Sequence, residues 1–144
     1  MKYILNIETS TTNCSVALAK DGETVCVNED NSLKYSHAER LHVYIDEVLK
    51  KTNIQKSEIA AVAVSKGPGS YTGLRIGVSA AKGLCFALDI PLISVPTLEA
   101  LAYKQQIKNG CIVAMLDARR MEVYASTFDS EYNCIEPTLS LIHI

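Results

Sequence analysis

The sequence lacks the features that mark several common classes of protein. Its formal net charge is -2 at pH 7 and its pI is about 5.9, so it has no basic excess for tight, unaided binding to nucleic acid. No apolar run reaches the length of a membrane span, and no signal peptide precedes the first strand pattern. We therefore expect a cytoplasmic protein with no membrane partner.

The cysteines and histidines are not spaced for metal binding. The five cysteines are odd in number, scattered and mostly set within apolar runs, and no C-x-x-C or Cys/His spacing occurs. This distribution predicts reduced thiols that serve as small buried hydrophobic side chains. His37 and His42 are five residues apart, so they do not share a helix face as an i, i+4 metal pair would. We interpret both as helix-surface residues and expect no metal site.

What the sequence does contain is an alternation of short strands and helices. With 144 residues, 48% of them hydrophobic and 21% charged, the chain is long enough for one globular domain or slightly more. Periodicity and turn signals predict strands over 3–7, 14–19, 23–28, 59–65, 91–95, 111–116 and 121–128, and helices from a capping box at Ser36 and Glu39, from about Gly73, and from Thr97 to Asn109-Gly110. This order predicts an α/β fold in which one mixed sheet carries helices on its faces.

The centre of the chain combines a buried strand, a glycine loop and a helix. The strand over 59–65 is an unbroken apolar run, which favours burial on both faces. Gly67 and Gly69 flank a proline and permit backbone angles that other residues avoid. Ser70 or Thr72 can then cap the helix that follows.

The glycine loop could either hold an anion or only make a tight turn. Amide groups at a helix N-terminus attract anions, but the next glycine is Gly73, one place too late for G-x-G-x-x-G, and no P-loop Gly-Lys-Ser/Thr follows. The polar turn after the first strand leaves the same choice, since its hydroxyl groups could meet a ligand or satisfy the turn backbone. The weak candidates for a cofactor contact are Glu8, Thr9, Ser10, Gly67 and Gly69.

The central helix has one polar stripe, made of Arg75, Ser79 and Lys82. The rest of its circumference is apolar or small, and part of it is a strip of small and flat residues that lets another backbone come close. Either the same chain covers this strip or another subunit does. If a subunit covers it, the partner interface consists of Gly73, Gly77, Ala80, Leu84 and Ala87.

The order of elements, with an acidic residue at the end of the first strand, resembles the ribonuclease H-like core of the actin, hexokinase and Hsp70 superfamily. Four motifs make the resemblance more specific: NIETSTTNCSVAL (6–18), SKGPGSYTGLRIGVSAAKGL (65–84), PLISVPTLEALA (91–102) and LDARRMEVY (116–124). They are similar to the TsaB family, formerly YeaZ, across nearly the whole chain. Members of that family are the dimerisation subunits of the bacterial complex that makes threonylcarbamoyladenosine beside the tRNA anticodon.

The resemblance implies a scaffold without catalytic residues. TsaD, the related catalytic subunit, has an H-x-x-x-H metal motif after the fifth strand, and the matching segment 94–100 contains no histidine here. Phosphoryl-transferring relatives have a glycine soon after the acidic residue, and none follows Glu8 within residues 9–13. An ATP-dependent enzyme of the same superfamily, such as a TsaD-like transferase, a small kinase or a glycopeptidase-like hydrolase, is the alternative.

The same resemblance implies the partners. A TsaD-like subunit would form a heterodimer with this chain and would carry the ATP and the metal, so this chain alone would bind no cofactor. A TsaE-like ATPase would belong to the wider complex, and tRNA would be contacted only through it. When the chain is alone, the resemblance implies that it could pair with a second copy of itself as a homodimer.

The resemblance also divides the chain into lobes. Residues 1–105 correspond to a ribonuclease H-like first lobe, and 106–138 to the beginning of a second, similar lobe that is truncated by comparison with the family. Residues 139–144 read as the translation of a transposon mosaic-end sequencing adapter, so we exclude them from fold reasoning. The strand over 121–128 would then be uncovered, which invites pairing along its edge.

Overall fold

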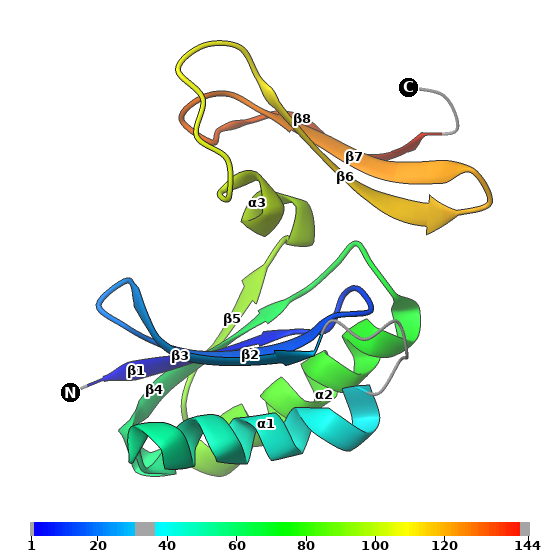
Figure 1. Cartoon of the computed structure of the whole chain (residues 1–144). Helices are drawn as coiled ribbons and strands as arrows, with labels where there is room; N and C mark the ends of the chain where they lie inside the picture. The colour runs from blue at the N-terminus through cyan, green and yellow to red at the C-terminus, as the bar shows by residue number, and fades with distance from the viewer. Residues whose placement is uncertain (1, 31–36, 142–144) are drawn as a thin grey trace. The chain divides into compact units, whose positions relative to one another are not determined.

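The computed structural model describes residues 2–30 and 37–141. In chain order its elements are β1 (Tyr3–Glu8), β2 (Cys14–Lys20), β3 (Glu23–Asp30), α1 (His37–Thr52), η1 (Lys56–Glu58), β4 (Ile59–Ser65), α2 (Tyr71–Leu88), β5 (Leu92–Val95), α3 (Thr97–Ala102), β6 (Ile112–Arg119), β7 (Glu122–Phe128) and β8 (Cys134–Leu141) (Figure 1). The chain divides into a first unit, residues 1–66 and 70–94, and a second unit, residues 67–69 and 95–144. This division falls earlier than the boundary at residue 105 that the resemblance implies.

The first unit is a five-stranded mixed sheet with two helices on one face. The strand order is β3-β2-β1-β4-β5, in which β1 pairs antiparallel with β2 and parallel with β4. Both α1 and α2 lie against the same face of this sheet (Figure 1). The α/β fold with a mixed sheet, predicted from the order of elements, is thereby confirmed.

Burial follows from the position of each strand in the sheet. The residues of β1 and β2 alternate between buried and more exposed positions, because successive side chains of a strand point to opposite faces. Strand β4 lies between β1 and β5 and is buried almost throughout, as its apolar run predicts. Strand β5 is an edge strand, and Ile93 is 40% exposed. The prediction of a buried strand over 91–95 is therefore wrong, since β5 has a neighbouring strand on one side only.

The helix starts differ in detail from the prediction. Ser70 caps α2 by accepting a hydrogen bond from the Gly73 amide (3.3 Å), so the helix begins at Tyr71 rather than near Gly73. For α1 the expected cap, Ser36, lies outside the described residues.

His37 is not the helix-surface residue that the sequence suggests. It is only 2% exposed, and its Nε2 lies 2.7 Å from the Thr11 carbonyl oxygen. A carbonyl oxygen can only accept, so Nε2 carries the proton and donates it. The turn after β1 reaches over the start of α1 and covers this ring, whereas His42 is exposed as expected.

The second unit is a three-stranded antiparallel sheet in the order β6-β7-β8. Its core joins one face of α3 to the inward side chains of the sheet, and its buried residues are Leu98, Ala102, Ile112, Ala114 and Phe128. Helix α3 ends at Ala102, so the predicted end at Asn109-Gly110 is wrong. Beyond α3 the chain is not helical, and contacts with Tyr132 fix its position. Tyr103 stacks on Tyr132 with ring centroids 4.2 Å apart, and the Tyr132 hydroxyl donates to the Gln105 carbonyl (2.8 Å).

Strand β7 is covered on both sides. It pairs with β6 and also with β8, where Tyr124 lies opposite Ser140 and Ala125 opposite Leu139. The prediction of an uncovered strand over 121–128 is therefore wrong. It failed because no strand was predicted over residues 134–141, the last three of which we excluded from fold reasoning.

The five cysteines are all free, but they are not all buried. Cys14 and Cys85 are buried, and burial raises the pKa of both thiols. Cys111 and Cys134 are exposed, so the prediction of buried thiols does not hold for the second unit. No helix in the described part of the chain is long and apolar enough to cross a lipid bilayer.

Candidate functional site

Glu8 is the acidic residue at the end of β1. Its Oε1 accepts a hydrogen bond from the Ser10 amide (2.7 Å), and its Oε2 accepts one from the Ser65 hydroxyl at the end of β4. Each carboxylate oxygen therefore already has a partner from the same unit. Glu8 thus joins the end of β1 to the end of the parallel strand β4, which is a structural role.

The next two residues, Thr9 and Ser10, are buried and tie the turn to α2. The Thr9 hydroxyl donates to the Gly73 carbonyl (2.8 Å), and the Ser10 carbonyl accepts from the Ser70 amide (2.6 Å). Both contacts lie at the start of α2, so they fix the turn after β1 against that helix. The polar groups of this turn thus satisfy its own backbone and α2, which is one of the two roles that the sequence left open.

Positions 73 and 77 have room only for glycine, because Thr9 packs directly against the backbone of α2 there. A Cβ at Gly73 would lie 2.1 Å from the Thr9 carbonyl oxygen and 3.1 Å from Cδ2 of His37. A Cβ at Gly77 would lie 2.2 Å from the Thr9 hydroxyl oxygen. Any side chain here would overlap atoms of the same chain.

The partner interface expected at Gly73 and Gly77 is therefore corrected: the same chain covers both glycines. Ala80 and Leu84 are half-buried and pack against the core of the first unit, so a partner contact at these two residues stays a prediction. Of the five residues expected at the interface, only Ala87 is exposed. At Gly73 and Gly77, this close contact is made with the turn after β1.

The exposed face of α2 contains a large apolar side chain that the sequence interpretation missed. Arg75, Ser79 and Lys82 are exposed, as the polar stripe predicts. Phe86 is 92% exposed on the same helix. At 100° per residue Phe86 lies about 20° from Arg75, in the middle of the polar stripe. An aromatic side chain inside a polar stripe is the signal that could have identified it.

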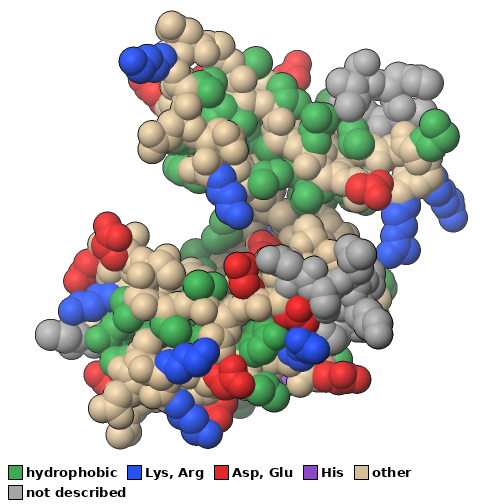
Figure 2. Space-filling view, in the orientation of Figure 1, with side chains coloured by type: hydrophobic (Ala, Val, Ile, Leu, Met, Phe, Trp, Pro, Cys, Tyr) green, Lys and Arg blue, Asp and Glu red, His purple; other side chains and the backbone are tan. Residues whose placement is uncertain are grey.

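The surface around Phe86 is open, and α1 also has an exposed apolar side chain. A Cβ at Gly83 would have no atom within 4 Å, and Ala87 is exposed. On α1, which contacts α2, Val43 is 50% exposed. Figure 2 shows Lys/Arg and Asp/Glu side chains interspersed over the first unit on the side in view. The two helices therefore combine exposed apolar residues with charges of both signs.

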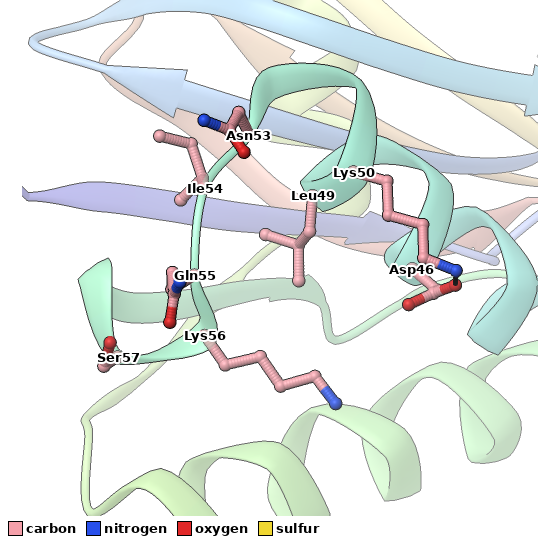
Figure 3. A pocket seen from close by; sticks show the side chains of 8 residues that line it. All are labelled: Asp46, Leu49, Lys50, Asn53, Ile54, Gln55, Lys56 and Ser57. Carbon is pink, nitrogen blue, oxygen red and sulfur yellow. Dashed lines mark ion pairs between the residues drawn. The ribbon is translucent and has the colours of Figure 1, made fainter.

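A surface hollow of about 570 Å³ lies at the C-terminal end of α1 (Figure 3). Asp46 and Lys50 form an ion pair on its rim (2.6 Å). Lys56 also lines it and has no ion-pair partner among residues 2–30 and 37–141. The remaining lining residues are Leu49, Asn53, Ile54, Gln55 and Ser57.

The remaining cofactor candidates are the two loop glycines. Gly67 and Gly69 have φ values of 110° and 156°, which explains why glycine occupies both positions. The Gly67 carbonyl accepts from the Thr97 amide (2.9 Å) within the second unit. Within the described ranges, no group of three His, Cys, Asp or Glu side chains could hold a metal ion.

Comparison with known proteins gives consistent matches. The family model described as TsaD, tRNA N6-adenosine threonylcarbamoyltransferase, matches residues 31–142. The proteins named tRNA threonylcarbamoyladenosine biosynthesis protein TsaB from Haemophilus influenzae and Bacillus subtilis are 39% and 36% identical, over 85% and 92% of this chain and 52% and 58% of their own lengths. The structure of YeaZ from Pseudomonas aeruginosa superposes with a TM-score of 0.86 at 32% identity, over 98% of this chain and 68% of that one. The chain thus spans about half the length of the curated relatives.

Proposed function

Because the chain belongs to the TsaB (YeaZ) family, within the wider group that the TsaD model describes, we propose that it is a non-catalytic subunit of tRNA threonylcarbamoyladenosine biosynthesis. The observation that carries the proposal is the state of Glu8. Both of its oxygens accept hydrogen bonds from the same unit, and the neighbouring Thr9 and Ser10 are buried. Glu8 thus joins the ends of β1 and β4, while Thr9 and Ser10 tie the turn after β1 to α2.

The chemistry would then reside in a partner. The described residues offer no three-residue metal cluster, and the segment 94–100 lacks the paired histidines of a TsaD-like chain. ATP and metal would belong to a TsaD-like catalytic subunit, with a TsaE-like ATPase in the wider complex, and tRNA would be bound through the assembly. This chain would act by holding the catalytic subunit in its active arrangement.

The outward face of α1 and α2 is the surface best suited to that partner. Phe86 offers a large aromatic side chain in an open setting, Ala87 beside it in the sequence is exposed, and Val43 is an exposed apolar residue of α1. Aromatic residues surrounded by polar ones are typical anchors of protein interfaces. Arg75 and Lys82 on the same face would lie at the rim, where charges influence the rate of association and the choice of partner. A second copy of the chain could occupy this face when the catalytic subunit is absent.

Reconstitution tests the proposal. The purified protein is mixed with the TsaD-like subunit and the other pathway proteins, and threonylcarbamoyladenosine in tRNA is measured by mass spectrometry with this chain present or left out. We expect product only when it is present, and we expect Glu8→Gln to support normal product formation. The alternative, an ATP-dependent enzyme, requires the protein alone to turn over ATP. Turnover that survives purification and is lost in Glu8→Ala would overturn the scaffold proposal.

A further inference from the structure

The turn between β6 and β7 holds three successive residues in an unusual backbone conformation. Arg119, Arg120 and Met121 have φ values of 65°, 55° and 62°. Side-chain-bearing residues rarely adopt positive φ, and hairpin turns that need it usually contain glycine or asparagine. A strained turn is a reason to look for function at that place. The turn also belongs to the LDARRMEVY motif, which the proposed scaffold role leaves unexplained.

The two arginine side chains of this turn are exposed. Each adjacent carboxylate accepts a hydrogen bond from a neutral donor: Asp117 Oδ1 accepts from the Arg119 amide (2.8 Å), and Glu122 Oε2 accepts from the Ser140 hydroxyl (2.8 Å). Neither guanidinium group forms an ion pair within the described part of the chain. Figure 2 shows Lys/Arg side chains projecting at the turn end of the β6–β7 hairpin. Met121, beside them, is 91% exposed.

We propose that the β6–β7 turn contacts the phosphate backbone of the RNA substrate. A guanidinium group binds a phosphate through two parallel hydrogen bonds, and phosphates recur along a strand, so that Arg119 and Arg120 can each engage one. The exposed thioether of Met121 is suited to an adaptable contact with a base or a ribose. This inference rests on the proposed function, which supplies the RNA.

The charge of the whole chain limits what the turn can do. With a net charge of -2, two arginines do not make the isolated chain a tight RNA binder. Their contribution appears in the assembled complex, where the catalytic subunit holds the same tRNA. The turn would add affinity and orientation without reading bases.

Binding of tRNA by the assembled complex tests this inference. The protein, joined to the TsaD-like subunit, is titrated with a fluorescent tRNA transcript at several salt concentrations. We expect the double variant Arg119→Ala/Arg120→Ala to raise Kd about tenfold at low salt and to reduce the slope of log Kd against log salt by about 1 to 2, as the loss of one or two phosphate contacts requires. The matched control, Lys104→Ala/Lys108→Ala, removes the same charge from exposed positions of the same unit and should change the slope much less.

Three results would overturn the inference. The arginine variant could bind tRNA with the same salt slope as the lysine control, it could fail instead to join the TsaD-like subunit in gel filtration, or it could weaken ATP binding with no change in tRNA binding. The last two would make the turn a protein contact or a nucleotide site. If the alanine variant melts early, Arg119→Lys/Arg120→Lys keeps the charge and loses the paired hydrogen bonds, so Kd should rise while the slope is kept; an unchanged Kd would contradict the proposal. Failure of the proposed function would give a different result: threonylcarbamoyladenosine would then form in tRNA even when this chain is left out.

Discussion

The hydroxyl oxygen of Thr9 occupies the space in which a side chain at Gly77 would begin, since a Cβ built there would lie 2.2 Å from it. The same hydroxyl group donates to the Gly73 carbonyl one helical turn earlier (2.8 Å). The turn after β1 is thus bound to the face of α2 on which Gly73 and Gly77 leave no side chain. This contact joins residues 64 positions apart in sequence and links the acidic strand end to the helix that presents Phe86.

Gly77→Ala should destabilise the protein even though alanine favours helix. The added methyl group overlaps the Thr9 hydroxyl, so the turn must move and its bond to the Gly73 carbonyl is lost. Overpacking of this kind typically costs about 1–3 kcal/mol. Chemical denaturation of the purified variant measures the change in the free energy of unfolding.

Gly83→Ala is the matched control on the same helix. No atom lies within 4 Å of a Cβ at Gly83, so only helix propensity should affect the stability of this variant. We expect its free energy of unfolding to rise by up to about 1 kcal/mol. A second check combines Gly77→Ala with Thr9→Ala, which removes the overlapping hydroxyl and should recover part of the loss. If Gly77→Ala and Gly83→Ala have equal stability, the contact with Thr9 does not constrain the helix.

Phe86→Ala should separate binding from stability. The side chain is almost fully exposed, so its removal should change the free energy of unfolding by less than about 0.5 kcal/mol. If Phe86 is the anchor of the partner interface, the complex with the TsaD-like subunit should weaken at least tenfold, which is about 1.4 kcal/mol. Lys82→Ala, on the same face, is the control and should have a smaller effect. Calorimetric titration gives both affinities, and unchanged binding by Phe86→Ala would show that the partner docks on another surface.

Local patterns predicted much of the fold. The strand over 59–65, the α/β order and the exposure of Arg75, Ser79 and Lys82 follow from periodicity, which depends only on neighbouring residues. Phe86 lay within reach of the same reasoning, because its place in the polar stripe follows from helix geometry.

The remaining features depend on contacts between distant residues, which no local pattern contains. The burial of His37, Gly73 and Gly77 follows from the path of the turn after β1. The pairing of β7 on its second side depends on β8, which no local pattern predicted as a strand. Small residues on a helix indicate a close approach, but they do not identify what approaches.

Asp129 should make the stability of the second unit depend on pH. Asn133 donates to its carboxylate through the side chain and the backbone (both 2.9 Å), and these hydrogen bonds, with one from the Glu131 amide, hold the pKa of Asp129 below its ordinary value of 3.8. A lowered pKa in the folded state means that the carboxylate stabilises the fold above the ordinary value, and that this contribution disappears as the pH falls through the lowered one. Asp129→Asn should therefore lower Tm at pH 7, and the difference from the parent should shrink below about pH 4.

Glu131→Gln is the control for that titration. It lies in the same turn, and its carboxylate accepts no hydrogen bond in the described part of the chain, so its effect on Tm should be small at pH 7. Thermal melts of both variants from pH 7 to pH 3 provide the comparison. A difference between Asp129→Asn and the parent that stays constant over this range would show that the hydrogen bonds do not depend on the charge.

Met121→Gly should stabilise the protein by relieving the strained turn. The φ of Met121 is 62°, and a left-handed conformation costs a residue with a side chain about 1–2 kcal/mol, whereas glycine adopts it freely. Glycine also loses more backbone entropy on folding, about 0.5–1 kcal/mol, so a net gain of about 0.5–1 kcal/mol is expected. The exposed side chain of Met121 contributes little packing to offset this gain. Met121→Ala is the matched control, because it removes the same side chain and keeps the strain. If the two variants unfold at the same denaturant concentration, the turn is not strained at this residue; if only the glycine variant is stabilised, the native sequence carries a conformational cost at the turn where we place the RNA contact.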